Sequence, residues 1–501
     1  MQSLTPFASQ HAVKLRIAAI AFIATIALLQ LYLWFGDATR ILPGKLVSYL
    51  KERPASKLPR ISSDPRLGRE ELALKQNTTS DITCGGIDVE GILYVKAAKT
   101  IDPDLDIFLS DATNYPQIGL PSSTWMDQSM RERWYSLNTV ALWRPETRTY
   151  WTANRVPYFV RGQRTYPLVS YTWWEVWNED ITERLESGVF PIYIPQYQDH
   201  YTGPEDPRAF EDPYGHVCFV FTMLDMDGLA KIWMFNTTTQ IQVALHTPQG
   251  REEQVREKNW TPFIHDGKVK FVYSMKPLSI VKCEFSTGDC QFDYATDSNP
   301  SISSLHGGTN WVPWYDSGYY ISVAHTAAGP NKIYRLTLVV LSTHDETYRI
   351  TYASGPFDLK NITLLEPFGN HKNISEINPR GTNSGRILIG CSISRTDLFD
   401  QDSILISVST MDNSTTLLEV GGISDLMESI IHKAERDQSW HIDDGKFIEC
   451  AEKTAEQHME DMCQADDNAR NDDRDEEGET EEEETNPDEP RKPKQEDELL
   501  T

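Results

Sequence analysis

The sequence predicts an all-β fold, a five-bladed β-propeller, for the central part of this 501-residue chain. Between residues 84 and 448, short β-prone runs alternate with Gly, Pro, Asn and Asp turns, and helical periodicity is scarce. A unit made of a turn, an apolar strand, a polar loop and a second strand recurs along this body. The chain also holds 13 Trp, 21 Tyr and 18 Phe, enough aromatic material for a large core or a carbohydrate site.

The repeated unit begins at four glycines, Gly215, Gly267, Gly318 and Gly385, with weaker relatives near Gly91 and Thr149. Repetition of four-stranded sheets around an axis produces a propeller whose strand ends converge on a central funnel. The length of the body fits about five such blades. A β-sandwich is the competing all-β arrangement, but it does not explain polar motifs that recur at the same place before successive strands.

The N-terminus predicts a single membrane span at residues 17–35, which carry no charge. This length approaches the ~20 residues that cross a bilayer as a helix. Lys14 and Arg16 precede the run and no acid does, so the positive-inside rule places residues 1–16 in the cytosol. A cleaved signal peptide is the alternative, but the apolar run is too long and no small-residue cleavage site follows. Residues 37–83, with four prolines, are predicted to form a luminal stem.

Sequons and cysteines agree with a luminal body. Candidate N-glycosylation sites are Asn77, Asn236, Asn361, Asn373 and Asn413. The seven cysteines include no C-x-x-C pair, so no zinc framework is visible. In an oxidising compartment some cysteines pair, and Cys283 with Cys290 across a Ser-Thr-Gly-Asp turn is the expected hairpin bridge.

The formal net charge of −27 argues against a nucleic-acid-binding protein, because phosphate neutralisation needs a basic face. Nearly half of this charge lies in residues 461–501, which hold 18 acids and 5 bases. Residues 465–501 contain almost no apolar side chains and are predicted to be a disordered acidic tail. A solvating role is favoured for the tail over weak cation binding. Just before the end of the body, Asp425–Ala434 is expected to form a helix packed on its outside.

The first of three polar clusters spans residues 203–213 and contains Glu205, Asp206, Pro207 and Arg208. Pro207 is expected to hold Asp206 in an extended conformation. Two adjacent carboxylates beside an arginine form an acid/base candidate with a charge partner. A plain turn is the alternative, since Asp-Pro and Glu-Asp are common turn formers.

The second cluster, Glu257, Lys258, Asn259 and Trp260, precedes a strand predicted at Val269–Ser274. Lys258 can neutralise a phosphate or pair with a carboxylate, and Asn259 can bind sugar hydroxyls. Trp260 either stacks on a pyranose or fills the core. Asn259 is formally a sequon, but its place within this cluster disfavours glycosylation.

The third cluster consists of His306, Gly307, Gly308 and Thr309, ahead of a strand predicted at Tyr319–Val323 and of His325. The two glycines allow backbone N–H groups to approach an anion. His306 and His325 are candidates for phosphate contacts or proton transfer, although a lone histidine is more often structural. Because the three clusters precede strands at similar offsets, they are expected to meet in one funnel.

The stretches GPEDPRAFED, EKNWTPF with YSMKPLSIVKC, and HGGTN with ISVAHT resemble the motif series of the fungal β-1,2-mannosyltransferases, Golgi type II membrane enzymes of cell-wall mannan synthesis. The resemblance runs from about Ile87 to Ser409, with the motifs in family order. The Glu-Asp-Pro-Arg element also resembles inverting mannoside phosphorylases and mannosyltransferases on five-bladed propellers, whose matching Asp is the catalytic acid or base. His306 departs from the family, in which an Arg is expected before Gly-Gly-Thr.

The resemblance implies an inverting transfer of mannose from GDP-mannose to an α-mannoside acceptor in cell-wall mannan or glycoprotein glycans. It implies Asp206 as the base, directly or through a sugar hydroxyl, with Glu205 and Arg208 tuning it or binding the sugar. Lys258 and His325 are the candidates for the diphosphate, and Asn259 and His306 for sugar contacts. The full set of expected substrate-binding residues is Arg208, Glu257, Lys258, Asn259, Trp260, His306, Gly307, Gly308, Thr309 and His325.

No cofactor is firmly implied. Asp225 and Asp227 form an Asp-x-Asp like those that bind a divalent metal in many nucleotide-sugar transferases, but a hairpin turn is favoured there. No Gly-x-Gly-x-x-Gly fingerprint or P-loop is present. Two other functions stay open, a mannoside phosphorylase or hydrolase on the same propeller, and a non-catalytic, membrane-anchored glycan-binding propeller.

Overall fold

A computed structural model describes residues 72–75, 84–87, 89, 92–101, 136–158, 169–195, 203–248, 256–296, 303–328, 333–344, 347–359, 388–395, 402–410, 414–437 and 445–460. The chain divides into residues 1–60 and 61–501, and all described residues lie in the second part. The predicted cytosolic N-terminus, the span at 17–35 and the acidic tail at 465–501 lie outside the described residues. Within the described ranges, no helix is long and apolar enough to cross a membrane.

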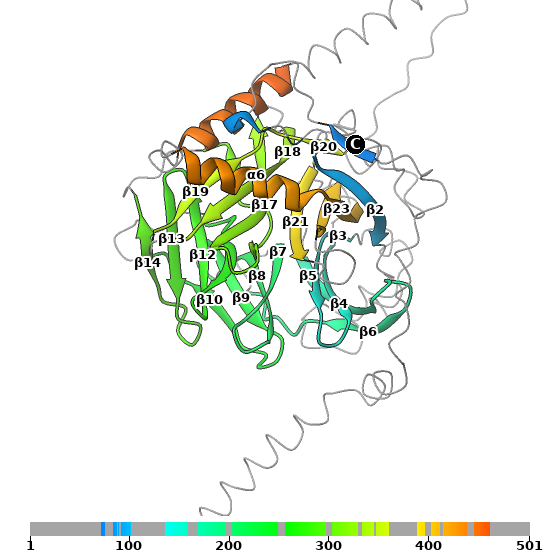
Figure 1. Cartoon of the computed structure of the whole chain (residues 1–501). Coiled ribbons are helices and arrows are strands. Elements are labelled where there is room, and N and C mark those ends of the chain that lie inside the picture. Colours follow the sequence, from blue (N-terminus) through cyan, green and yellow to red (C-terminus); the bar gives the residue numbers. More distant parts are fainter. Residues whose placement is uncertain are drawn as a thin grey trace, which may run out of the picture. The chain divides into compact units, whose positions relative to one another are not determined.

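The described strands form five antiparallel sheets, which confirms the predicted five-bladed all-β propeller (Figure 1). Three sheets are simple meanders: β3 (Leu137–Arg144), β4 (Thr149–Tyr158), β5 (Val169–Asn178), β6 (Arg184–Val189); β7 (Glu205–Glu211), β8 (Val217–Leu224), β9 (Ala230–Asn236), β10 (Gln242–Leu245); and β11 (Thr261–His265), β12 (Lys268–Met275), β13 (Leu278–Cys283), β14 (Cys290–Ala295). A fourth contains β15 (Leu305–His306), β16 (Val312–Pro313), β17 (Tyr319–Ala328), β18 (Ile333–Ser342) and β19 (Arg349–Ala353).

The fifth sheet joins strands from both ends of the body. Its order is β20 (Asp358–Leu359), β1 (Leu72–Lys75), β2 (Tyr94–Ile101), β23 (Ser414–Gly421), β22 (Ile404–Thr410) and β21 (Leu388–Arg395). The pairing of β2 with β23 connects the early and late parts of the ring. Because β1 pairs with β2, residues 72–75 of the predicted stem belong to the folded body.

The repeated units coincide with the middle strands of the blades. The units at Gly215, Gly267 and Gly318 supply β8–β9, β12–β13 and β17–β18. Gly267 and Gly318 adopt φ of 65° and 74° in the turns before these strands, a conformation that glycine reaches without a side-chain clash. The unit at Gly385 is displaced by one strand, since it supplies β21 and β22, the inner and second strands of the fifth sheet.

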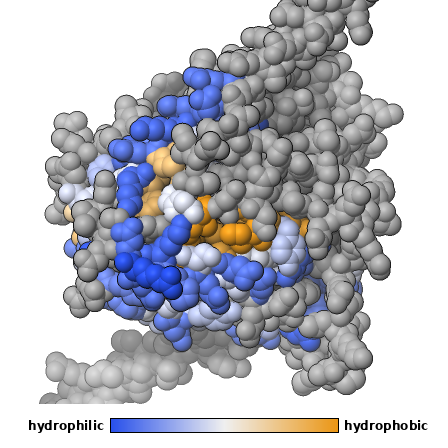
Figure 2. Space-filling view, turned by 45° about the horizontal axis from the view of Figure 1, so that its top comes forward, coloured by the Kyte–Doolittle hydropathy of each residue, from blue (hydrophilic) through white to orange (hydrophobic). Residues whose placement is uncertain are grey.

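Among the described residues, two α-helices accompany the propeller. The predicted helix at 425–434 is α6 (Ile423–Arg436), which buries Ile423, Leu426, Met427 and Ile430 in the same hydrophobic cluster as β17–β19. Asp402 caps it, because its carboxylate accepts hydrogen bonds from the N–H groups of Gly422 and Ser424 at 2.9 and 2.7 Å. A second helix occupies 445–460, so the predicted end of the body at 448 falls inside it. In Figure 2, hydrophilic residues surround one hydrophobic band on the visible surface.

Within the described part of the chain, two disulfides stabilise this architecture. Cys283 and Cys290, the pair expected from the sequence, are joined across the β13–β14 hairpin, where they are register partners. Cys84 is joined to Cys450, 366 residues later, a link that the sequence analysis did not anticipate. This second bridge fixes the C-terminal helix to the N-terminal part of the body. Among the described cysteines, Cys218 and Cys391 form no disulfide and are buried.

Candidate active site

A cavity of ≈ 540 Å³ lies where the inner strands of the five sheets converge. Its volume is in the range of ordinary small-ligand sites. Every sheet contributes to it: Asn138 and Arg155 from β3 and β4; Asp206, Pro207 and Arg208 from β7; Arg256, Lys258 and Asn259 ahead of β11; Ser303, Ser304, His306, Gly308, His325, Ala327 and Tyr334 from the β15–β18 sheet; and Ile389, Gly390 and Cys391 from β21. The three polar clusters therefore meet in one funnel, as expected.

Three inner strands each contain one extra residue at the cavity. Between Leu137 and Val140 in β3, between Glu205 and Arg208 in β7, and between Gly390 and Ser392 in β21, the pairing register shifts by one residue. Such β-bulges turn a side chain out of the alternating pattern and are frequent next to active sites. They account for the positions of Asn138, Asp206 and Cys391 in the lining.

Asp206 does not adopt the extended backbone that was expected from Pro207. Its φ is 49°, in the left-handed region, and the bulge of β7 imposes this conformation despite the preference of residues before proline. Asn138, at φ 51° in β3, donates a hydrogen bond from Nδ2 to Asp206 Oδ1 at 3.1 Å. Asn259 is also left-handed, at φ 64°. Backbone strain of this kind clusters at functional sites, and here three strained residues line one cavity.

Glu205, predicted as a catalytic partner, is occupied by two ion pairs. Its Oε1 lies 3.0 Å from Arg155 Nη2 and its Oε2 lies 3.1 Å from Arg256 Nη2. Both arginines line the cavity. The geometry gives Glu205 the role of orienting these two cations beside Asp206, whose side chain is 44% exposed.

Arg208 connects all three clusters from a buried position. It donates hydrogen bonds to the carbonyls of Gly307 and Gly308 and, from Nη1, to the carbonyl of Asp206 at 3.1 Å. Its Nη2 also lies 3.5 Å from Asn259 Oδ1. The carbonyls of both glycines therefore bind the guanidinium, while the predicted contact of their N–H groups with an anion stays a prediction. A Cβ on Gly308 would lie 2.3 Å from the Val323 carbonyl, so close packing requires glycine there.

The charged lining is strongly cationic. Arg155, Arg208, Arg256 and Lys258 face a single carboxylate, that of Asp206, among the described lining residues. Burial lowers the pKa of Arg208, and the charge of Asp206 opposes this effect. An arginine stays protonated under such a shift because its ordinary pKa is so high. The cavity therefore attracts anions, although the chain carries a net charge of −27.

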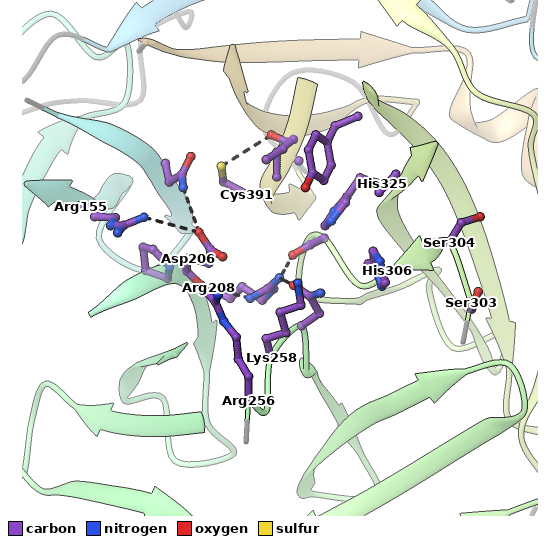
Figure 3. A pocket seen from close by; sticks show the side chains of 18 residues that line it. Arg155, Asp206, Arg208, Arg256, Lys258, Ser303, Ser304, His306, His325 and Cys391 are labelled. Atoms are coloured by element: carbon purple, nitrogen blue, oxygen red, sulfur yellow. Dashed lines mark hydrogen bonds and ion pairs between the residues drawn. The ribbon is translucent and has the colours of Figure 1, made fainter. Parts of the chain in front are cut away.

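His325 cannot serve as a cationic diphosphate ligand near neutral pH. Burial lowers its pKa well below the ordinary value, and the neighbouring His306, Arg208 and Lys258 lower it further. Its ring lies 5.7 Å from that of His306, and its Nδ1 has no hydrogen-bond partner among the described residues. In Figure 3, Arg155 and Asp206 face His306 and His325 across the cavity. A neutral imidazole in this position suits a hydroxyl rather than a phosphate.

Glu257, Trp260 and Thr309 lie outside the described lining, which favours structural roles for them. Trp260 is buried in a hydrophobic cluster, and its Nε1 donates to Glu257 Oε2 at 3.2 Å. Glu257 Oε1 also accepts a hydrogen bond from Tyr273. Thr309 is buried beside Ser322, with its hydroxyl 3.0 Å from the Ser322 hydroxyl. Of the two readings of Trp260, the structure favours the core.

Asp225 serves the β8–β9 turn and lies outside the cavity lining. Its carboxylate accepts hydrogen bonds from the N–H groups of Asp227 and Leu229 and pairs with Lys231 at 2.9 Å. No group of acids, histidines or cysteines within the described ranges is arranged to hold a metal ion. The hairpin turn that the sequence favoured at this position is what these contacts show.

Asn236 is a poor glycan acceptor in this fold, because it is 8% exposed and its Oδ1 accepts the N–H groups of Thr238 and Thr239. Four other predicted glycosylation sites lie outside the described residues: Asn77, Asn361, Asn373 and Asn413.

Sequence reasoning missed the polar lining residues Asn138, Arg155, Arg256, Ser303, Ser304 and Tyr334, and also Cys391. Arg256 directly precedes the second cluster, so extending that motif by one or two residues would have found it. Asn138 and Arg155 lie in strands with no polar cluster of their own. No sequence pattern marks them, because a β-bulge places Asn138 in the cavity and an ion pair with Glu205 places Arg155 there.

Comparisons with known proteins find similarity to β-mannosyltransferases over a range that includes the second and third clusters. The family described as Beta-mannosyltransferases matches residues 216–458. Beta-mannosyltransferase 4 of Komagataella phaffii is 25% identical over 382 residues, covering 66% of this chain and 71% of the relative. Beta-mannosyltransferase 3 of Candida albicans is 25% identical over 338 residues, covering 56% of this chain and 61% of the relative.

Among solved structures, a hypothetical protein from Leishmania major has a TM-score of 0.37 at 11% identity, covering 58% of this chain and 86% of its own. The mannose phosphorylase MPT-4 from Leishmania mexicana, in complex with phosphate ion, has a TM-score of 0.35 at 11% identity, covering 57% and 84%. These scores are too low to bear on function. Residues 216–458 of this chain are thus similar to the β-mannosyltransferases, as are the curated relatives above.

Proposed function

We propose that this protein is an inverting β-mannosyltransferase that moves mannose from GDP-mannose to a hydroxyl of an α-mannoside acceptor, forming a β-1,2 linkage. One observation carries the proposal: one carboxylate, Asp206, faces four cations among the described residues of a central cavity. Glycosidases characteristically need a pair of carboxylates at the scissile bond. A transferase with a diphosphate leaving group needs one base and several cations.

The cations suit the donor. A leaving diphosphate gains negative charge as its bond to the sugar breaks, and preorganised positive groups stabilise that charge in the transition state. We assign this role to Lys258 and Arg256, which come from the same segment ahead of β11. Arg208 donates hydrogen bonds to backbone carbonyls and so stabilises the site. Its positive charge also favours an anion in the cavity.

Asp206 is assigned as the general base. The acceptor hydroxyl attacks the anomeric carbon, its proton passes to the Asp206 carboxylate directly or through a sugar hydroxyl, and the bond to the diphosphate oxygen breaks. Attack on the face opposite to the leaving group turns the α-linked donor into a β-linked product. The hydrogen bond from Asn138 orients the carboxylate for this step.

Neutral polar groups are assigned to the sugars. Asn259, His306 and His325 line the cavity, and a buried His325 Nδ1 without a partner among the described residues carries a desolvation cost. A mannose hydroxyl would satisfy that nitrogen. The assignment replaces the diphosphate contact that the sequence alone indicated for His325.

The proposal includes a location. A span at residues 17–35 with basic residues on its N-terminal side would make this a type II membrane protein with its body in the Golgi lumen. The acceptors would then be cell-wall mannan or the glycans of glycoproteins.

The test is to incubate the full chain in detergent with GDP-mannose and an α-linked mannobiose, and to determine the product linkage by NMR. A β-1,2-linked mannose is the expected result. Mannose transfer that requires free phosphate or water, without GDP-mannose, would instead indicate a phosphorylase or hydrolase. Glycan binding without any transfer would indicate a lectin.

A further inference from the structure

One wall of the cavity is held in place from the C-terminal helix. Ser303 and Ser304 line the cavity just ahead of β15. Glu452, on the helix at 445–460, accepts hydrogen bonds through Oε1 from the Ser303 hydroxyl at 2.6 Å and from the Ser304 N–H at 2.8 Å. The Ser304 hydroxyl lies 3.4 Å from the same oxygen. A single carboxylate oxygen thus organises both serines.

The other oxygen of Glu452 is anchored by a cation. Lys276 Nζ lies 3.1 Å from Oε2, and the Glu452 side chain is 14% exposed. Burial raises the pKa of Glu452, but hydrogen bonds from Ser303, Lys276 and the Ser304 N–H outweigh this and leave the pKa lowered. The acceptor is therefore an ionised carboxylate, which forms stronger hydrogen bonds than a neutral group.

The helix that carries Glu452 is itself fixed. Cys450, two residues earlier, is bonded to Cys84, and Ala451 and Ala455 are buried. The position of Ser303 and Ser304 therefore depends on the disulfide between Cys84 and Cys450. None of these helix residues lines the cavity among those described.

This wall differs chemically from the rest of the site. Ser303, Ser304 and Tyr334 supply uncharged hydroxyl side chains to the lining near the neutral His325. Arg155 and Arg256 lie on other sides of the cavity (Figure 3). Hydroxyls bind the hydroxyls of a neutral sugar, and cations bind a diphosphate. The wall therefore fits the sugar acceptor.

We propose that Glu452 is a positioning residue, which holds the Ser303–Ser304 segment in the geometry that binds the mannoside acceptor. It acts through the serines and touches no substrate. The inference rests on the proposed transferase function for its kinetic consequence, while the effect on the segment itself is independent of that function.

The test compares full-length Glu452→Ala, Glu452→Gln and a matched control, Glu449→Gln. Glu449 lies on the same helix and also pairs with Lys276, at 3.4 Å, but has no contact with the serines among the hydrogen bonds of the described residues. For Glu452→Ala we expect a roughly tenfold rise in the acceptor KM, equivalent to about 1.4 kcal/mol, with kcat changed less than about twofold. Glu452→Gln keeps an acceptor oxygen and should restore most of the affinity, and Glu449→Gln should match the wild type.

Hydrogen exchange provides the readout that does not depend on activity. In Glu452→Ala the Ser304 amide should exchange at least about tenfold faster than in the wild type, with the amides of β8 unchanged. Unchanged exchange at Ser304, or an unchanged acceptor KM, overturns the inference. If Glu452→Ala does not fold, Lys276→Met is compared with the wild type by the same two measurements, because it removes the cation that anchors Glu452. If the wild type transfers no mannose, the proposed function fails, and exchange alone decides whether Glu452 positions the wall.

Discussion

Arg208 Nη2 donates a hydrogen bond to the carbonyl of Gly307 at 2.9 Å across 99 residues of sequence. The same guanidinium binds the carbonyls of Gly308 and Asp206, so one buried side chain holds the first and third polar clusters together. The planar fork of arginine makes these contacts possible in several directions at once. The mutual position of Asp206 and the sugar-facing residues depends on this link.

Replacing Arg208 should destabilise the fold. Arg208→Lys retains a charge but loses the fork, leaving buried carbonyls unpaired, so we expect the free energy of unfolding to fall by about 2–4 kcal/mol. Urea denaturation measures it. Arg148→Lys, at a partly exposed ion pair with Glu179, is the control and should cost less than about 1 kcal/mol. Equal losses in the two variants would contradict the linking role.

The cation ahead of β11 should govern donor binding. Lys258→Gln removes one positive charge from the cavity, so the KM for GDP-mannose should rise by roughly tenfold and depend less on salt. Steady-state kinetics at two ionic strengths measures both effects. The control Lys231→Gln alters a cation that pairs with Asp225 at the β8–β9 turn and should leave the donor KM unchanged. A rise confined to the acceptor KM would place the diphosphate elsewhere.

The buried His325 should make stability depend on pH. Its pKa is lowered in the folded state, so as the pH falls below about 6.5 the unfolded chain gains a proton that the folded chain does not. Stability therefore decreases with falling pH in this window, by up to about 1.4 kcal/mol per pH unit.

His325→Gln should reduce that slope between pH 7 and 5, as measured by denaturant unfolding. His432→Gln changes a histidine that is 63% exposed on α6 and should keep the wild-type slope. An identical slope for His325→Gln and the wild type would show that His325 is not held neutral by the fold.

The two disulfides should differ in their contribution to stability. A crosslink restricts the unfolded chain more when it closes a longer loop. The double variant Cys84→Ser/Cys450→Ser opens a loop of 366 residues and should lose about 2–5 kcal/mol. Cys283→Ser/Cys290→Ser opens a separation of only 7 and should lose less. Guanidinium denaturation of both variants measures the two losses in the free energy of unfolding. A larger loss in Cys283→Ser/Cys290→Ser would contradict the expected order.

The fold was predictable because its signals are local and repeated. Glycine turns such as Gly267 and Gly318 are followed by apolar strands. The regular recurrence of these turns indicates a repeated blade, and no knowledge of packing is needed to recognise it. The meeting of the polar clusters followed from the same repetition, since equivalent positions in successive blades face one axis. Asp225 in its hairpin turn and α6 near the end of the body were likewise readable from short windows.

The sequence did not predict the features that depend on packing. The left-handed backbone of Asp206 arises from a bulge, which overrode the local preference set by Pro207. The neutral state of His325 follows from burial, and the choice of core over ligand for Trp260 follows from its neighbours. Glu452 could not be found, because its partners Ser303 and Ser304 lie about 150 residues earlier in the chain.

We assign Asp206 as the base of a GDP-mannose-dependent transfer, and kcat for Asp206→Asn tests this role most directly. Asn keeps the size of the side chain and tolerates the left-handed backbone. Asp266→Asn is the matched control, since Asp266 is also left-handed, at φ 52°, but its side chain is 76% exposed outside the cavity lining. We predict a loss of about 10²–10⁴-fold in kcat for Asp206→Asn and none for Asp266→Asn. Transfer by Asp206→Asn at the wild-type rate would contradict the account.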